Sequence, residues 1–291
     1  SFSAWVRVNS AAYGMLVNEV TRFDHFVGQV TAELERQGAL ANTLLLVMAD
    51  NGRPFPRAKT RLHDCGMKTF LVAHWPAGIK RPGARARGIV SAIDIAPTVL
   101  GLAGVAVPET MQGVSFASLF ADPEACVRQC AFSEHNWHDY EAHGRSVRAE
   151  GYLYIRNQRP QFAWQGPADS VASPSYQNLR VLRDDGILSA AQADVFLAPR
   201  PVDELYLTAD DPDQLRNLAD EPKHAAAKRR LAAMLEAWVE ATADSAPEKL
   251  SADSFDRETG KPLRNHAKNA FRGTPAGSDR GAARVNRPGP R

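Results

Sequence analysis

Cysteine is scarce in this chain of 291 residues, which has three, at positions 65, 126 and 130. They form neither a C-x-x-C pair nor a zinc-binding spacing, so the sequence indicates no disulfide framework and no zinc site. Long apolar runs are missing as well, because no uninterrupted stretch approaches the roughly 18 residues that a membrane helix requires. What remains is an ordinary globular composition without a membrane span, with 44% hydrophobic and 23% charged residues.

Positively and negatively charged residues are also nearly balanced in number. The formal net charge of +2 is too small to indicate a nucleic-acid partner. The positive excess sits at the C-terminal end, where eight Lys and Arg residues occur from Lys261 onward against a single acid, Asp279. The opening residues show no signal peptide and enter an amphipathic segment almost at once. The cellular location is therefore left open.

The first part of the chain has an α/β pattern. Apolar residues recur at alternating steps of three and four from Tyr13 to Leu34, which predicts a long amphipathic helix that ends near Gly38. Continuous apolar runs follow, and such runs are typical of strands buried on both faces of a parallel sheet. We therefore predict a large domain over residues 1–125 with a mainly parallel sheet. Its strands are expected at 43–49, 69–75 and 88–90, and a second helix at 95–103.

The pattern changes after about residue 125. Two short strands that meet at Glu150-Gly151 suggest an antiparallel hairpin, and residues 157–200 are predicted to form a long excursion. We predict a smaller α+β subdomain with antiparallel strands over 126–245, followed by a basic, disordered tail over 246–291. The subdomain is expected to hold strands at 145–150, 152–156 and 205–207, and a helix at 225–240 with Leu231, Met234, Leu235 and Trp238 on one face.

The first candidate site residues along the chain are Asp50-Asn51-Gly52, directly after the predicted strand at 43–49. In open α/β sheets the ligand site lies at the carboxyl ends of the strands. A carboxylate beside an amide offers two hard oxygen ligands, which suit Ca²⁺ or Mg²⁺ better than a soft metal. The alternative is an ordinary turn, because Asp-Asn-Gly is also a common turn sequence.

The run from Asp50 to Gly66, D-N-G-R-P-F-P-R-A-K-T-R-L-H-D-C-G, closely resembles a signature of the type I, formylglycine-dependent sulfatases. The resemblance implies an alkaline-phosphatase-like sulfatase fold, in which Asp50 and Asn51 bind a divalent cation, normally Ca²⁺ with Mg²⁺ as the alternative. It also implies that Lys59 contacts the sulfate being cleaved, where a cation stabilises the charge that develops as the S–O bond breaks. Further matching stretches are F-L-V-A-H-W-P at 70–76, D-x-x-P-T at 94–98, Q-G-V-S-F at 112–116, E-L-Y-L at 204–207 and D-P-D-Q-L-R-N-L at 211–218.

Within the family, the residues after Asp50-Asn51-Gly52 and the stretch at 173–179 are most similar to heparan N-sulfatase (sulfamidase) and its bacterial relatives. The implied substrate is a sulfated sugar or glycosaminoglycan, with N–S or O–S cleavage left open. We expect His135, Trp137 and His138 to contact the sugar, since an aromatic face plus polar groups often holds one. Arg145 is expected to bind a carboxylate or second sulfate. The alternative is an exposed loop without such a role.

The family's nucleophile motif, C/S-x-P-x-R, does not occur in the 291 residues. The resemblance therefore places the formylglycine, with the remaining metal ligands, in an N-terminal half that is a prospective partner of this chain. We expect a fragment, a split gene product or a degenerate copy, inactive alone. Two rival functions stay open: a phosphoesterase or phosphonate hydrolase of the same superfamily, and a non-catalytic module that binds sulfated glycans. By family, the location would be periplasmic, secreted or lysosomal.

Overall fold

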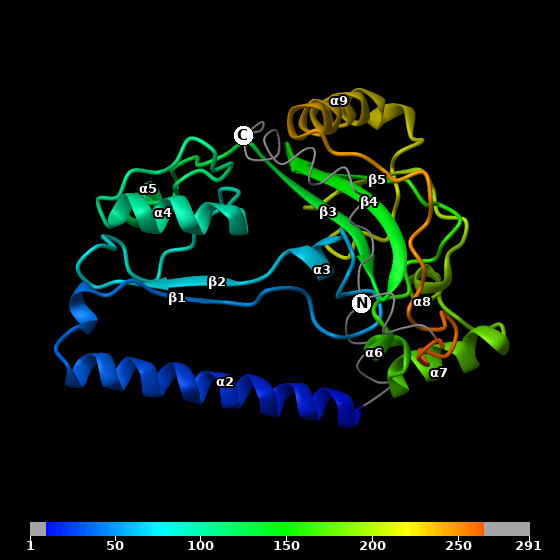
Figure 1. Cartoon of the computed structure of the whole chain (residues 1–291), viewed down its shortest axis with the longest axis horizontal. Coiled ribbons are helices and arrows are strands. Elements are labelled where there is room, and N and C mark those ends of the chain that lie inside the picture. The colour runs from blue at the N-terminus through cyan, green and yellow to red at the C-terminus, as the bar shows by residue number, and fades with distance from the viewer. Residues whose placement is uncertain (1–9, 265–291) are drawn as a thin grey trace.

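The computed structural model describes residues 10–264, which fold into two parts (Figure 1). In the first part, a two-stranded ribbon of β1 (Leu45–Met48) and β2 (Leu71–His74) lies between the long helix α2 (Ser10–Arg36) and the helices α4 (Ile95–Leu102) and α5 (Ser118–Ala121). In the second part, a four-stranded sheet is flanked by further helices. Short 3-10 helices at Leu40–Asn42 and Ala92–Asp94 precede β1 and α4.

Helix α2 confirms the predicted amphipathic segment. It ends where Gly38 adopts the left-handed conformation at a φ of 68°, and the N–H of Ala39 then reaches the carbonyl of Leu34 at 2.9 Å. Its apolar stripe faces outward among the described residues, since the side chains of Val20 and Phe23 are exposed. No helix within residues 10–264 is both long and apolar enough to cross a membrane.

The pairing of β1 with β2 corrects the expectation of a parallel sheet. The strands are neighbours, but they run antiparallel, with Leu45 opposite His74 and Met48 opposite Leu71. A parallel pair needs a crossover of a dozen or more residues, usually a helix, that returns to the starting end. Here the only helix between the strands is the single turn α3 (Asp64–Met67), and the connecting loop returns to the edge it left.

Burial of this ribbon also differs from expectation. The strands were predicted to be buried on both faces, but β2 is largely exposed among the described residues, and its Val72 is 54% accessible. The third predicted strand, at 88–90, is reduced to an isolated bridge between Ile89 and Arg128. An apolar run therefore predicts a strand, but it does not predict whether other elements cover that strand.

Two family-like stretches, D-x-x-P-T and Q-G-V-S-F, join at the start of α4. The buried Asp94 carboxylate accepts hydrogen bonds from the backbone of Ser91 and of Val114, at 2.8 and 2.7 Å, and pairs with Arg128. Thr98 donates to the Asp94 carbonyl and accepts from the Phe116 N–H. These contacts therefore fix the start of α4, which agrees with the predicted helix at 95–103.

The second sheet has the order β3-β4-β5-β6, with every neighbouring pair antiparallel. Glu150 and Gly151 both have positive φ, 52° and 77°, as a two-residue hairpin turn requires, so the predicted hairpin is confirmed. The strands are β3 (Cys130–His138), β4 (Tyr140–Ala149), β5 (Tyr152–Asn157) and β6 (Asp203–Leu207).

One face of this sheet is covered by α9 (Ala225–Thr242), with Leu231 and Leu235 of the predicted apolar helix face in the core. The opposite face is covered by the loop between β1 and β2, whose Leu62 packs against Leu153, Ile155 and Trp164. Alternate residues of each strand thus serve two cores, which is why β4 is buried along nearly its whole length.

The predicted excursion over 157–200 holds several short helices and its own core. Tyr140 of β4 packs there with Tyr176 and Leu179. Ser173 accepts a hydrogen bond from the Tyr176 N–H and so begins the longest of these helices. The helices are α6 (Ala168–Val171), α7 (Pro174–Asp184), α8 (Ala190–Ala193) and the 3-10 turn Asp194–Phe196; another 3-10 turn, Pro222–His224, precedes α9.

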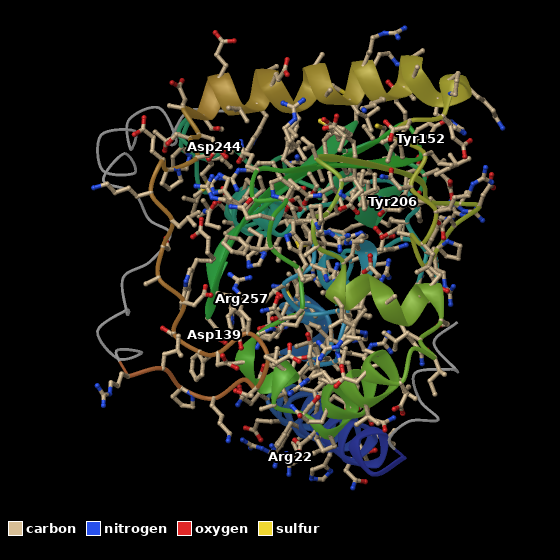
Figure 2. All side chains as sticks on the ribbon, turned by 90° about the vertical axis from the view of Figure 1, so that its right-hand side faces the viewer. Arg22, Asp139, Tyr152, Tyr206, Asp244 and Arg257 are labelled. Carbon is tan, nitrogen blue, oxygen red and sulfur yellow. The ribbon has the colours of Figure 1, made fainter. Side chains whose placement is uncertain are left out.

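The predicted tail is ordered over 246–264, so the expectation of disorder was wrong for this stretch, while 265–291 lie outside the described residues. The Asp253 carboxylate accepts from the Glu141 N–H at 2.7 Å, and the Ser254 N–H donates to the Asp139 carbonyl at 2.8 Å. In Figure 2, Arg257 on this segment and Asp139 at the end of β3 lie on the same side of the molecule. Hydrogen bonds from the backbone and from the Asp253 side chain to the junction of β3 and β4 hold this segment, and composition does not reveal such contacts.

The core between α9 and the sheet should dominate the stability of the second part. Leu231→Ala removes a fully buried side chain and should lower the free energy of unfolding by about 2–5 kcal/mol. Leu250→Ala, at a half-exposed leucine, is the matched control and should change it by less than about 0.5 kcal/mol. Urea unfolding of the full chain measures both, and equal effects would contradict the assigned core.

Candidate functional site

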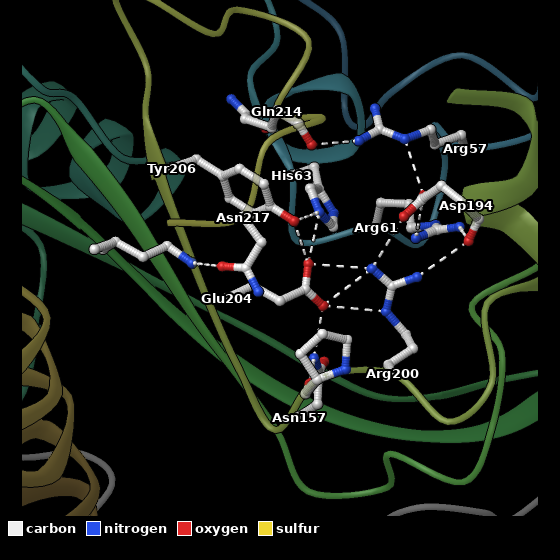
Figure 3. A network of polar contacts seen from close by, with 12 residues as sticks. Arg57, Arg61, His63, Asn157, Asp194, Arg200, Glu204, Tyr206, Gln214 and Asn217 are labelled. Atoms are coloured by element: carbon white, nitrogen blue, oxygen red, sulfur yellow. Dashed lines mark hydrogen bonds and ion pairs between the residues drawn. The ribbon is translucent and has the colours of Figure 1, made fainter. Parts of the chain in front are cut away.

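The loop between β1 and β2, residues 49–70, carries the Asp-Asn-Gly and Lys59 motif and is anchored by a buried polar network. Three of its side chains, Arg57, Arg61 and His63, are buried. Figure 3 shows them pointing into the second part of the molecule. We use the name polar network for these three residues together with Asp194, Arg200, Glu204 and Tyr206.

Asp194 is the centre of one half of this network. Its carboxylate lies 2.9 Å from Nε of Arg57, 3.1 Å from Nη1 of Arg61 and 3.3 Å from Nη2 of Arg200. Burial alone would raise the pKa of this carboxyl, but the three guanidinium groups outweigh burial and hold the pKa well below its usual range. Arg57 also donates to the carbonyls of Asp213 and Gln214, at 2.8 and 2.6 Å.

Glu204 is the centre of the other half. Its carboxylate accepts from Arg200 at 3.0 Å, from the Tyr206 hydroxyl at 2.5 Å and from Asn157 at 2.7 Å, and it lies 3.2 Å from Nε2 of His63. Burial opposes ionisation here too, yet hydrogen bonding and charge from His63 and Arg200 lower the pKa of the Glu204 carboxyl. Burial lowers the pKa of His63 despite this partner.

Lys59 sits between the two anchoring arginines of the loop. Its N–H donates to the Arg53 carbonyl at 3.1 Å, and Thr60 beside it holds a φ of 71°. A β-branched residue in this region is strained, and such strain persists only where neighbours enforce it. The Lys59 side chain is 25% exposed, with Nζ 3.9 Å from a carboxylate oxygen of Asp169. The structure therefore presents this cation at the surface of a rigidly held loop.

The predicted metal pair lies at the turn after β1. One Asp50 oxygen accepts hydrogen bonds from the backbone and side-chain nitrogens of Asn51, at 2.9 and 3.0 Å. The side-chain oxygens of Asp50 and Asn51 fit part of the oxygen shell of a hard cation. Within residues 10–264 no group of three or more His, Cys, Asp or Glu side chains comes together to complete a metal site. Whether Asp50 faces the same cleft as Lys59 stays a prediction.

A small pocket that is open to solvent lies beside the loop that carries Lys59. Thr60, next in sequence to Lys59, lines it, as do the predicted residues His135 and His138. Those histidines belong to strand β3 and not to a loop, although His138 at its end is exposed. The remaining lining residues are Tyr140, Glu141, Ala142, Ala163, Trp164, Gln165, Gly166 and Arg257.

Two predicted sugar contacts are engaged elsewhere. The Arg145 guanidinium is buried and forms a bidentate ion pair with Asp244, at 2.5 and 2.7 Å. The Trp137 indole N–H donates to the Ala252 carbonyl at 3.2 Å. Neither residue lines the described pocket, and both bind the segment that follows α9, whose contacts no local sequence pattern predicts.

Sequence reasoning missed Trp164 and Gln165, which lie in the stretch taken as an excursion. An indole, an amide and a glycine in succession, Trp164-Gln165-Gly166, were the available signal. It also missed the polar network, although two arginines four residues apart and a histidine inside one motif were visible. Their partners lie more than 130 residues away along the chain.

Comparison with known families gives this geometry a context. The Sulfatase family model matches residues 9–105, and the model described as N-sulphoglucosamine sulphohydrolase, C-terminal, matches residues 58–165. The chain belongs to the sulfatase family, whose members are hydrolases, and it is similar to the sulfamidase branch. The resemblance inferred from the motifs is confirmed.

Individual relatives agree. An ulvan-active sulfatase of Formosa agariphila is 31% identical over 233 residues, which cover 79% of this chain and 38% of the relative. Human N-sulphoglucosamine sulphohydrolase is 28% identical over 229 residues, 75% of this chain and 46% of the relative. This chain thus spans less than half the length of these relatives.

A solved structure of similar fold was determined in complex with its substrate D-glucosamine-2-N,6-O-disulfate. It superposes with a TM-score of 0.57 at 19% identity and covers 76% of this chain and 39% of that one. The fold is therefore the alkaline-phosphatase-like sulfatase fold, of which this chain contains a part together with the C-terminal subdomain.

Removing the central carboxylate of the polar network should be strongly destabilising. Asp194→Asn leaves three buried guanidinium groups without their shared anion, and we expect the free energy of unfolding to fall by about 3–5 kcal/mol. Asp169→Asn, which removes an exposed carboxylate paired with Lys59, is the matched control and should cost less than about 1 kcal/mol.

Acid should mimic the Asp194 substitution. Because its folded-state pKa is depressed, Asp194 adds stability above the ordinary carboxyl pKa of about 4 and loses that contribution as the pH falls further. Urea titrations of the full chain at several pH values should show a flatter acid limb for Asp194→Asn. Wild-type and variant curves of the same slope would contradict this assignment.

Proposed function

We propose that the complete protein is a sulfatase that hydrolyses a sulfate ester or sulfamate on a sugar, and that this chain is its C-terminal portion. The observation that carries the proposal is the position of Lys59, held on a loop anchored by the polar network and adjoining a pocket lined by His135 and His138. Family membership supports the same reaction.

Lys59 is proposed as the catalytic cation. When the bond to sulfur breaks, negative charge grows on the leaving oxygen, and a preorganised cation stabilises that charge most where water is limited. The rigidity of the loop matters because a cation that must first be ordered contributes less. Arg57 and Arg61 hold the loop on either side of Lys59, and Asp169, which is exposed, offers a carboxylate that substrate can displace.

Asp50 and Asn51 are proposed as metal ligands for Ca²⁺, with Mg²⁺ as the alternative. They supply part of a shell in which calcium takes 6–8 oxygens. In a sulfatase the bound cation and the formylglycine supply the Lewis acid and the nucleophile. Neither Asp50 nor Lys59 can replace that nucleophile, and C/S-x-P-x-R does not occur in this sequence. The remaining ligands and the nucleophile are therefore proposed to come from an N-terminal half.

A sulfated amino sugar is the proposed substrate. Support comes from the names of similar proteins: the human relative is an N-sulphoglucosamine sulphohydrolase, and the solved neighbour was bound to a disulfated glucosamine. His135 and His138 are proposed to contact the sugar. Arg145 and Trp137, engaged by Asp244 and Ala252, are left out of the proposed substrate set.

Turnover should require both halves. The 291-residue chain alone should release no detectable sulfate from aryl sulfates or sulfated glucosamine, whereas the chain joined to the nucleophile-bearing half of a relative should release it. In the joined protein, Lys59→Ala should lower kcat/KM by roughly 100- to 1,000-fold, as the loss of one oxyanion-stabilising group does. Lys68→Ala, at an exposed lysine of the same loop, is the matched control and should change it by less than about threefold.

Two outcomes would contradict this proposal. One is robust turnover by the repurified chain alone, which would mean that a different nucleophile is present. The other is a joined protein that hydrolyses phosphate or phosphonate monoesters and not sulfates, which would favour the phosphoesterase alternative. Sulfate and phosphate release are measured in parallel on matched aryl esters.

Calcium binding should be weak and should depend on Asp50. With two protein ligands at most in this turn, we expect a Kd on the order of 1 mM or weaker for the chain alone, and Asp50→Ala should abolish it. Asp210→Ala, at an exposed carboxylate of another turn, is the control. Calorimetry of the full chain measures the Kd for calcium. Tight binding that survives Asp50→Ala would place the metal elsewhere.

A further inference from the structure

The pocket beside Lys59 contains polar atoms that no described residue satisfies. Both ring nitrogens of His135 and the side-chain nitrogen of Gln165 are buried without a hydrogen-bond partner among residues 10–264. Gln165 is only 4% exposed, and both residues line the pocket. Buried polar atoms without partners are unfavourable and uncommon in native proteins. In an open pocket such atoms are stabilised by a small hydrogen-bonding group, such as the hydroxyl group of a ligand.

The charged groups of the same pocket are already paired. Glu141 accepts from Nε of Arg159 and from the Ser251 N–H, both at 3.0 Å. Arg257 donates to both carboxylate oxygens of Asp253, at 2.7 and 2.9 Å. An anionic ligand group placed here would meet the Glu141 carboxylate and would find the Arg257 cation already neutralised. The hydrogen-bonding capacity that remains is therefore uncharged.

His135 is uncharged as well. Burial, followed by the nearby charges of His138 and Arg145, lowers the pKa of His135 to about 3. A neutral imidazole has one donor and one acceptor nitrogen, and an amide such as Gln165 also has both. This pair matches the hydroxyl group of a sugar, which donates and accepts at once.

An aromatic wall completes the pocket. Trp164 lines it and meets the His135 ring edge-to-face, with ring centroids 6.2 Å apart. The guanidinium groups of Arg200 and Arg61 lie 5.3 and 5.8 Å from the Trp164 ring centre, so the polar network fixes the indole in place. Aromatic side chains with a few placed polar groups are the usual lining of small-molecule sites.

We infer that this pocket is a subsite for an uncharged, hydroxyl-bearing part of a sugar, with His135 and Gln165 as its specificity-determining residues. The inference rests on the proposed function, in which Lys59, the residue before the pocket-lining Thr60, takes the sulfate. It adds that the group entering the pocket carries hydroxyls and no second anion, because a buried anion without a free cation is strongly unfavourable.

The test uses the full 291-residue chain and N-acetyl-D-glucosamine, an uncharged amino sugar. In spectra of chain labelled with ¹⁵N histidine, the sugar should shift the ring signals of His135, and sodium sulfate should not. Gln165→Leu should raise the Kd for the sugar roughly three- to tenfold, the effect of one lost hydrogen bond. His135→Asn, which keeps hydrogen-bonding capacity, should bind better than His135→Phe.

The matched control is His143→Asn. His143 is a buried histidine of the neighbouring strand β4, and one of its ring nitrogens has no hydrogen-bond partner within residues 10–264; it does not line the described pocket. Its variant should bind N-acetyl-D-glucosamine within twofold of wild type. A sugar that fails to bind, or that binds Gln165→Leu and wild type equally, overturns the inference.

The two proposals fail separately. Lys59→Ala should leave the Kd for N-acetyl-D-glucosamine within twofold, because the sugar carries no sulfate, although it removes most turnover in the joined protein. Sulfate release without sugar binding by the chain would leave the proposed function standing and overturn the subsite. Sugar binding that responds to Gln165→Leu, with no sulfate release by the joined protein, would support the subsite and remove the proposed reaction.

Discussion

The contact of one buried carboxylate, Asp194, with three guanidinium groups is the interaction on which the rest of the site depends. Two of those groups belong to the loop that carries Lys59, and the third links the loop to Glu204 on the sheet. A buried cluster of this kind is a weak source of net stability but a strong constraint on geometry, because each charge must find its partner or be left unpaired. The loop conformation is thereby fixed by electrostatics.

The four-stranded sheet makes this arrangement possible. Alternation along β6 sends Leu205 into the core under α9 and presents Glu204 and Tyr206 to the loop on the opposite face. One strand therefore contributes to stability through one face and to the site through the other. The C-terminal motif E-L-Y-L is explained by these two duties, and none of its residues needs to touch a substrate.

Local signals in the sequence were sufficient for some features and not for others. The helix α2, the Glu150-Gly151 hairpin and the α9 core face were predicted because periodicity and turn residues act within a few positions. The antiparallel pairing of β1 and β2 was not, because an apolar run does not encode direction. The ion pair of Arg145 with Asp244 was not predicted, because Asp244 is 99 residues away along the chain.

The span of these contacts along the chain also sets an order of events during synthesis. Arg57 meets Asp194 across 137 residues and the Gln214 carbonyl across 157. Contacts between such distant segments form slowly, because the entropy of closing the intervening chain must be offset before they contribute. The Lys59 loop leaves the ribosome before Asp194 and Gln214, so it cannot adopt its final shape until the sheet and residue 214 have followed. The chemistry-bearing loop is thus among the last parts of the molecule to mature.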